Sequence, residues 1–187
     1  MTTYTRKLAD TARKEFDKFH LLRAQEEPLA SQVEEYWKGI ASFPGVGTPW
    51  SGVFISWCVK QAGAVKSEFV FAAAHARFVF AAISNAVNGI GVFHGHDVAT
   101  YAPKVGDILQ NNRAGSRFDF QYAKTHDAYL SHSAIVIEVG TDDKGGYLRT
   151  IGGNESHSVG MKEVRLDTNG RVKNPNGLYI SIIETLK

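Results

Sequence analysis

A hydroxyl at the expected start of a helix is the first feature with chemical potential. Thr48 and Pro49 favour a helix start, because threonine caps and proline suits the first helical position, so we expect a helix over residues 49–62. The unpaired N–H groups and the dipole at that end stabilise a developing anion. Ser51 is therefore a candidate nucleophile, and Gly52 would let a substrate approach the backbone closely. A serine at this position also commonly serves only as a cap.

A histidine at the start of an apolar strand is the second feature. Residues 132–139 are rich in β-branched side chains and predict a strand that begins with His132. A central strand rarely needs an imidazole at its end, so His132 is a candidate general base. The alternative is a strand-end histidine that faces water.

An amide follows the next expected strand. Residues 132–139 and 146–153 predict a hairpin around a turn over residues 142–146. His132 and Asn154 lie at similar distances from that turn, so antiparallel pairing brings them to the same end. The Asn154 side chain could accept from the imidazole N–H and fix its tautomer. An asparagine after two glycines is also typical of a simple turn.

The remaining polar residues have weaker claims to a chemical role. Cys58 lies in an apolar stretch and is expected to be a buried, unreactive core residue. His94, His96 and Asp97 lie in one expected loop without the distant partners that a metal site needs, so no metal or cofactor is expected. Asp107 follows a turn and is expected to be structural.

The order of the expected elements predicts an α+β fold. Helices are expected over residues 5–25, 30–41, 49–62 and 71–87, and strands after residue 107 and over 132–139, 146–153, 158–166 and 177–186. Helices followed by an antiparallel meander are typical of the α+β class. The 187 residues fit one domain, with a helical extension over residues 1–44 and a core over 45–187.

Composition excludes several classes of protein. The net charge of +2 is too mild for nucleic-acid binding, and the single cysteine excludes an internal disulfide. No stretch approaches the roughly 20 apolar residues of a membrane span. The first residues lack the apolar run of a signal peptide, so we expect a cytoplasmic location in the producing cell, with any export by a route that reads no cleavable signal.

Taken in order, these elements resemble the NlpC/CHAP group of papain-like amidases and endopeptidases, which cut peptidoglycan peptides. Residues 50–54 are similar to the nucleophile element that opens the central helix of that group, and residues 103–107 to the turn leading into its sheet. Residues 132–136 and 153–154 are similar to its histidine strand and the polar residue that follows. The ordered set spans residues 45–165 and implies a papain-like fold, with N-terminal helices packed on a central antiparallel sheet.

The resemblance implies a site as well as a fold. Its catalytic residues would be Ser51, His132 and Asn154, and its substrate contacts Trp50, Gly52, His75 and Arg113. Ser51 stands where the group has its nucleophilic cysteine, as in an uncharacterised bacterial branch that this chain resembles. Serine cannot rest as a thiolate–imidazolium pair and needs a base during attack, so a slower amide hydrolysis is expected. The serine would be a true nucleophile, an inactivating substitution, or part of a domain that binds without cutting.

Two functions follow from these alternatives. The first is an amidase or endopeptidase acting on a peptidoglycan peptide or a similar amide. The second is a catalytically inactive module that binds cell-wall fragments or a partner protein. A further hypothesis concerns the biological role, that of an antibacterial effector controlled by a neutralising immunity protein.

Overall fold

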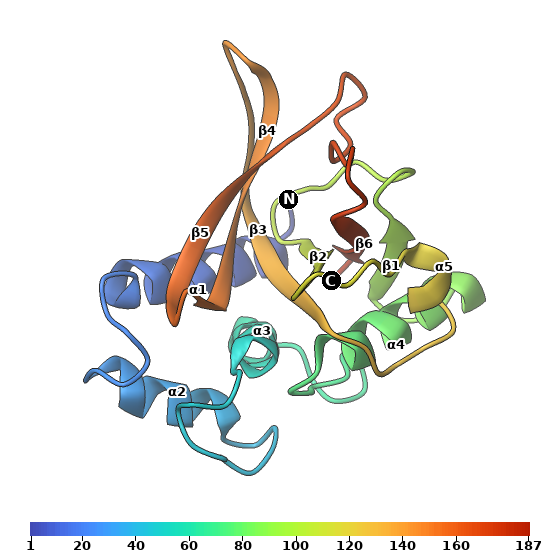
Figure 1. Ribbon diagram of the computed structural model, residues 1–187. Coiled ribbons are helices and arrows are strands. Elements are labelled where there is room, and N and C mark those ends of the chain that lie inside the picture. The colour runs from blue at the N-terminus through green and yellow to red at the C-terminus, as the bar shows by residue number, and fades with distance from the viewer.

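Five helices and six strands make up the fold in a computed structural model that describes residues 1–187. The helices are α1 (Thr3–Phe19), α2 (Leu29–Trp37), α3 (Ser51–Ala62), α4 (His75–Asn88) and α5 (Phe120–Ala123). The strands are β1 (Phe93–Asp97), β2 (Ile108–Asn112), β3 (Ser131–Asp142), β4 (Gly145–Glu155), β5 (Ser158–Arg165) and β6 (Tyr179–Thr185). The α+β class expected from the sequence is confirmed (Figure 1).

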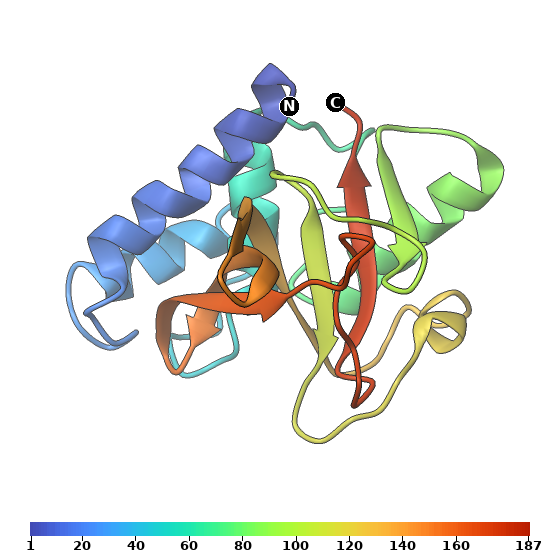
Figure 2. The ribbon, with the colours of Figure 1, turned by 90° about the horizontal axis from the view of Figure 1, so that it is seen from above.

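All six strands join in one antiparallel sheet with the order β1-β6-β2-β3-β4-β5. Strands β2 to β5 form the expected meander, whereas the last strand, β6, returns to lie between β1 and β2 (Figure 2). Strand β1 was not expected from the sequence. It contains His94 and His96, so these histidines lie in a strand and not in a loop.

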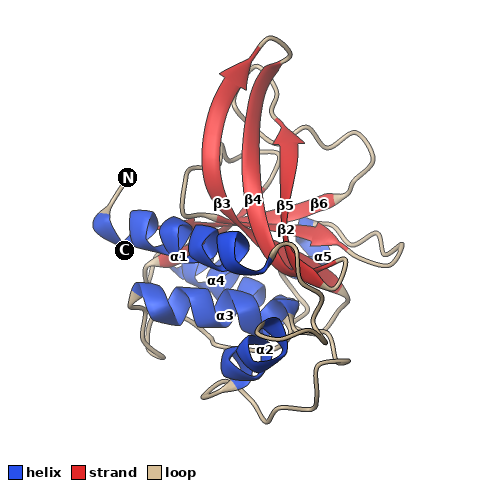
Figure 3. Cartoon of the chain, turned by 90° about the vertical axis from the view of Figure 1, so that its left-hand side faces the viewer, coloured by secondary structure: helices blue, strands red, loops and turns tan.

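The main helices gather on one side of the sheet, and β3, β4 and β5 rise away from them as a long arm (Figure 3). Helix α1 has a capping box, in which Thr2 and Thr5 each accept a hydrogen bond from the backbone N–H of the other. Its buried side chains recur at three- and four-residue steps and face α3 and β3. Helices α1, α2 and α3 therefore share one apolar core with the sheet.

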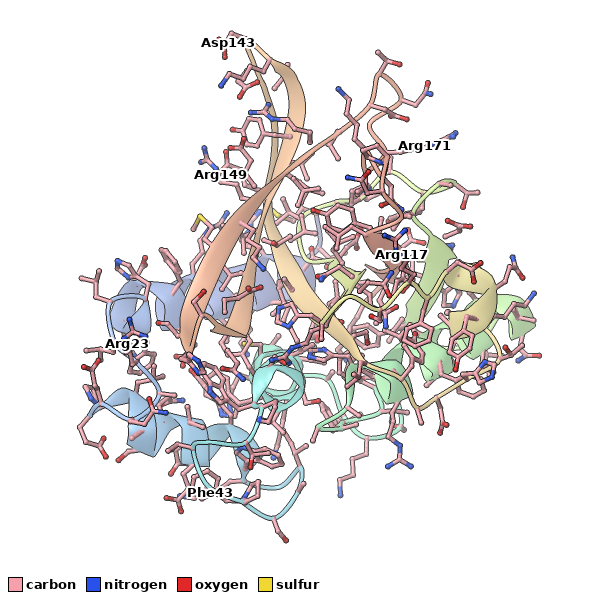
Figure 4. All side chains as sticks on the ribbon, in the orientation of Figure 1. Arg23, Phe43, Arg117, Asp143, Arg149 and Arg171 are labelled. Carbon is pink, nitrogen blue, oxygen red and sulfur yellow. The ribbon has the colours of Figure 1, made fainter.

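The arm carries charge on its exposed surface. The ring of Tyr147 lies 5.1 Å from the guanidinium of Arg149 and 5.8 Å from that of Arg165. Arg149 also pairs with Glu138. Figure 4 shows Asp143 at the tip of the arm and Arg149 along its side, both well away from α3. Of these residues, Arg165 lies on the edge strand β5, where a charged side chain protects the strand from pairing with another chain.

Four helix boundaries differ from the sequence expectation, and two of them, the starts of α3 and α4, lie in the site. Helix α1 ends at Phe19, and α2 at Trp37, each several residues earlier than expected. Helix α3 begins at Ser51 with Trp50 as its N-cap, so no threonine side chain caps it. Its expected end is confirmed, because Gly63 adopts the left-handed backbone, with φ at 113°. Helix α4 begins only at His75.

Candidate active site

Ser51 occupies the first position of α3, and its side chain meets an imidazole. Its Oγ lies 2.8 Å from Nε2 of His75, which is the first residue of α4. Both residues are buried, at 2% and 5% exposure. The sequence led us to expect that Ser51 would face His132, so the hydrogen-bond partner of Ser51 differs from that expectation.

Close packing between α3 and the segment that precedes α4 brings His75 to this position. A Cβ at Gly52 would lie 1.9 Å from the carbonyl oxygen of Ala73, so only glycine allows this approach. One turn further on, the Ser56 hydroxyl donates to the Ala72 carbonyl at 2.8 Å and accepts from the Ala72 N–H at 3.0 Å. Backbone contact at residues 72 and 73 thus aims His75 at the helix start.

The surroundings of His75 favour the neutral imidazole. Burial lowers the pKa of His75 well below its usual value, and the charges of His132 and Arg113 lower it further. The positive end of the α4 dipole also disfavours a second proton on the first residue of that helix. Nδ1 of His75 is buried and has no hydrogen-bond partner.

A second histidine, His132, stands beside the first. The rings of His75 and His132 have their centroids 5.3 Å apart. Nε2 of His132 lies 2.7 Å from Oε1 of Glu155, although their orientation is not that of an aligned hydrogen bond. Lys162 pairs with the other oxygen of Glu155. Burial raises the pKa of this carboxyl, but contacts with His132 and Lys162 outweigh burial and lower the pKa to about 2.

The carboxylate that contacts His132 takes the place expected for Asn154. The expected β3–β4 hairpin is confirmed, since Ile135 pairs with Ile151 and the strands meet at the turn after Asp142. Asn154, however, has a left-handed backbone with φ at 55°, and its side chain makes no hydrogen bond. The regular β4–β5 register breaks in this segment, between residues 152 and 155, and the next side chain, Glu155, is the one that reaches the imidazole.

Two of the four expected substrate contacts are occupied by the protein itself. Trp50 is 1% exposed, and its ring stacks on Tyr36 at a centroid distance of 5.7 Å, so it is a core residue. Gly52 contacts Ala73, as described above, which leaves no room there for a substrate. Arg113 is half-buried and follows β2 directly, and it makes no ion pair. Among the four, Arg113 is thus the side chain that keeps a free charge.

Three other polar groups have structural partners. Cys58 is fully buried, as expected, and burial raises the pKa of its thiol. Asp107 accepts hydrogen bonds from the backbone N–H groups of Lys104 and Thr185, at 2.8 and 3.1 Å, which explains its place after the turn. His96 contacts Glu184, with 3.0 Å between Nε2 and Oε2.

Glu155 has only a weak signal in the sequence, and the contact of His75 with Ser51 has none. Glu155 directly follows Gly152-Gly153-Asn154, but a register break in β4–β5 cannot be predicted from one sequence. His75 lies in an Ala- and Phe-rich stretch that we expected to be helical from residue 71. The late start of α4, which places His75 at a helix end, becomes evident only from the packing against Gly52.

The assembled site combines a hydroxyl, two imidazoles and a carboxylate at the N-terminus of a helix. A hydroxyl bonded to one imidazole, with a carboxylate-paired imidazole next to that ring, offers a nucleophile and a base for acyl transfer, in which the base takes the proton as the oxygen attacks. The partial positive charge at the start of α3 favours an oxyanion formed there. The geometry is therefore compatible with acyl-transfer chemistry.

Comparison with known proteins identifies a bacterial family. The family described as "Uncharacterized protein conserved in bacteria (DUF2272)" matches residues 26–182, and the chain belongs to it. The matched region includes every residue of the site described above. No curated protein and no solved structure matches the chain. None of its helices combines the length and the apolar character needed to span a membrane.

Proposed function

We propose that this protein is a hydrolase of the acyl-transfer type, with Ser51 as the nucleophile and an amide of a peptidoglycan peptide as the substrate. The observation that carries the proposal is the 2.8 Å hydrogen bond between the Ser51 hydroxyl, at the first position of α3, and the imidazole of His75. The contact between His132 and Glu155 adds a second imidazole with an acidic partner.

The substrate class in this proposal comes from the resemblance to the papain-like NlpC/CHAP group. The order of its elements agrees with that group: a helix that begins at the nucleophile, a turn into the sheet, and a strand that begins near the histidine. The α+β arrangement, with helices against an antiparallel sheet, is compatible with a papain-like fold. The charge on Arg113 would attract an anionic group of the substrate, and peptidoglycan peptides carry free carboxylates.

A second candidate function is a module that binds cell-wall fragments or a partner protein without cutting. Two observations favour it. Ser51 is only 2% exposed, so a substrate carbonyl reaches the hydroxyl only if the covering side chains move. The residue is also a serine where the enzymes that the chain resembles have a cysteine, which lowers the expected rate on amides.

The proposal has a consequence for where the protein acts. Peptidoglycan lies outside the cytoplasmic membrane, so a protein that cuts it must leave the cytoplasm of the producing cell. If the target is the wall of a competing bacterium, the producer needs a neutralising immunity protein, which would be the first partner to seek.

The test is incubation of the purified protein with soluble peptidoglycan fragments, followed by mass spectrometry. Cleavage that is lost in Ser51→Ala supports the hydrolase. Ser84→Ala is the control, because this serine of α4 is exposed and its hydroxyl contacts only the side chain of Asn88. Binding of fragments without cleavage supports the inactive module. If the protein neither cleaves nor binds the fragments, peptidoglycan is not its ligand.

A further inference from the structure

The two histidines at Ser51 have different electrostatic surroundings. His132 has the Glu155 carboxylate at 2.7 Å, and a carboxylate stabilises the imidazolium that forms when a base takes a proton. His75 has no acidic partner, lies at the positive end of α4, and has the positive charge of Arg113 near it. A proton transferred to His75 would therefore be poorly stabilised, whereas one transferred to His132 would be well stabilised.

The hydrogen bond at Ser51 has a direction that these surroundings determine. If Nε2 of His75 accepted from the hydroxyl, the ring proton would reside on Nδ1, where a buried N–H would lack any acceptor. If Nε2 donates, Nδ1 carries only a lone pair, and an unpaired buried acceptor is the less costly of the two. The donor arrangement also leaves the Ser51 proton free for another base.

We infer that His75 stays neutral and donates its Nε2–H first to Ser51 Oγ and then to the oxyanion, which leaves the Ser51 proton to His132, the base that the resemblance implies. This assignment rests on the proposed function. His132 uses Nε2 for Glu155, so Nδ1 is the ring nitrogen that turns to Ser51 in the reacting complex. The His132 ring lies next to the His75 ring, with 5.3 Å between their centroids, and catalytic hydrogen bonds often tighten only when substrate binds.

The resulting step balances. Ser51 Oγ bonds to the substrate carbonyl carbon while its proton passes to His132, and the carbonyl electron pair moves to the oxygen that His75 contacts. The carbonyl re-forms as the C–N bond breaks, and His132 returns the proton to the leaving amine. Water then attacks the acyl-enzyme in the same way and gives a proton to His132. His132 passes this proton to Ser51 Oγ as the ester C–O bond breaks, which frees Ser51.

NMR of the histidine rings tests the assignment on the wild-type protein, independently of any activity. With ¹⁵N-labelled histidine, and resonances assigned by single His→Gln variants, we expect His75 to show the neutral Nε2–H tautomer without titration between about pH 5 and 8. The groups that face it are Ser51, His132 and Arg113. A protonated Nδ1 on His75 overturns the assignment and leaves the proposed nucleophile untouched.

Covalent labelling of Ser51 by a fluorophosphonate, followed by peptide mass spectrometry, tests the two roles separately. His132→Gln should slow labelling by roughly 100-fold or more, since it removes the base. His75→Leu should slow it by about 100-fold, whereas His75→Gln should stay within about tenfold of wild type, because the amide N–H of glutamine replaces Nε2–H. His96→Gln, which breaks a similar histidine–glutamate contact elsewhere on the sheet, should have no effect.

Three outcomes overturn the inference. Equal losses in His75→Gln and His75→Leu, with His132→Gln near wild type, would make His75 the base. If the labelling rate depends on neither histidine, then neither takes part in the reaction. A wild-type protein that is never labelled, although its NMR shows the neutral donor at His75, would refute the nucleophile itself, and with it the proposed function. Circular dichroism of each variant excludes unfolding as the cause.

Discussion

Ser51 and His75 are 24 residues apart in sequence, yet their side chains form a 2.8 Å hydrogen bond at the meeting point of two helix N-termini. The contact depends on residues that take no part in chemistry. Gly52 lets the Ala73 carbonyl pack directly against α3, and Ser56 anchors Ala72 through two hydrogen bonds. The position of His75 relative to Ser51 therefore depends on how the backbone of residues 72 and 73 packs against α3. A small change in that packing should alter the Ser51–His75 hydrogen bond.

Substitution of Gly52 tests this dependence. In Gly52→Ala the new Cβ would lie 1.9 Å from the Ala73 carbonyl oxygen, so the segment that carries His75 must move. We expect a loss of roughly 1–3 kcal/mol in the free energy of unfolding, and a larger relative loss of Ser51 reactivity. Gly47→Ala is the matched control, because nothing lies within 4 Å of its Cβ position and its backbone is not left-handed. If urea unfolding gives the same free energy of unfolding for the two variants, the Ala73 carbonyl does not pack tightly against Gly52.

Substitution of Glu155 tests the acidic partner of His132. Glu155→Gln keeps the shape but removes the charge that stabilises an imidazolium, and we expect the rate to fall on the order of 100-fold or more. Because the pKa of Glu155 is about 2, the carboxylate stays ionised in the working range, so its own titration should not shape the wild-type pH–rate profile. Glu184→Gln, which removes the partner of His96, is the control.

Asn154→Gly keeps the left-handed backbone without the amide and should alter the rate less than tenfold.

The sequence predicted much of the frame of the site and less of its contacts. Apolar periodicity and turn residues located α3, the β3–β4 hairpin and the strand that begins near His132, because those signals are local. Strand β1 was missed, since Phe93–Asp97 is short and its histidines and glycine carry no strand pattern. The insertion of β6 between β1 and β2 is a long-range pairing that no local signal encodes.

The partners of the two histidines could not be predicted for a similar reason. Which nitrogen meets Ser51 depends on how α4 packs against Gly52, and which carboxylate meets His132 depends on a register break in β4. Both are results of tertiary packing. Ser51, His75 and His132 were singled out from the sequence, whereas the carboxylate of Glu155 and the pairing of these residues came from the fold.

The dependence of the free energy of unfolding on pH tests the burial of Asp107, which lies in the turn that leads into β2. Burial raises the pKa of Asp107 to about 6 from its ordinary value of 3.8, so the folded state holds this proton more tightly than the unfolded chain. The stabilisation is fully present below pH 3.8 and is lost as the pH rises through about 6. We expect a decline on the order of 2–3 kcal/mol in the free energy of unfolding across that window.

The matching variant for this test is Asp107→Asn. It should be less stable at every pH, because one carboxylate oxygen that accepts from a backbone N–H is replaced by an NH₂ group. The decline in stability between about pH 4 and 6 should, however, disappear in this variant. Urea unfolding at a series of pH values measures both proteins, and an unchanged slope in Asp107→Asn would assign the titration to another group.

Replacement of Ser51 by cysteine asks whether the site can support the chemistry of the enzymes that the chain resembles. In Ser51→Cys the thiol would lie at the positive end of α3, beside two imidazoles, and we expect its pKa to fall below the free value of about 8.5. Iodoacetamide alkylation rates against pH measure that pKa, and Cys58, which is fully buried, provides the unreactive reference in the same peptide map. Hydrolysis of peptidoglycan fragments by the variant but not by the wild type would mean that the native serine protein is a binder or acts on another substrate. A thiol that alkylates no faster than Cys58 at any pH would show that the start of α3 is closed to reagents, which would contradict its role as a nucleophile site.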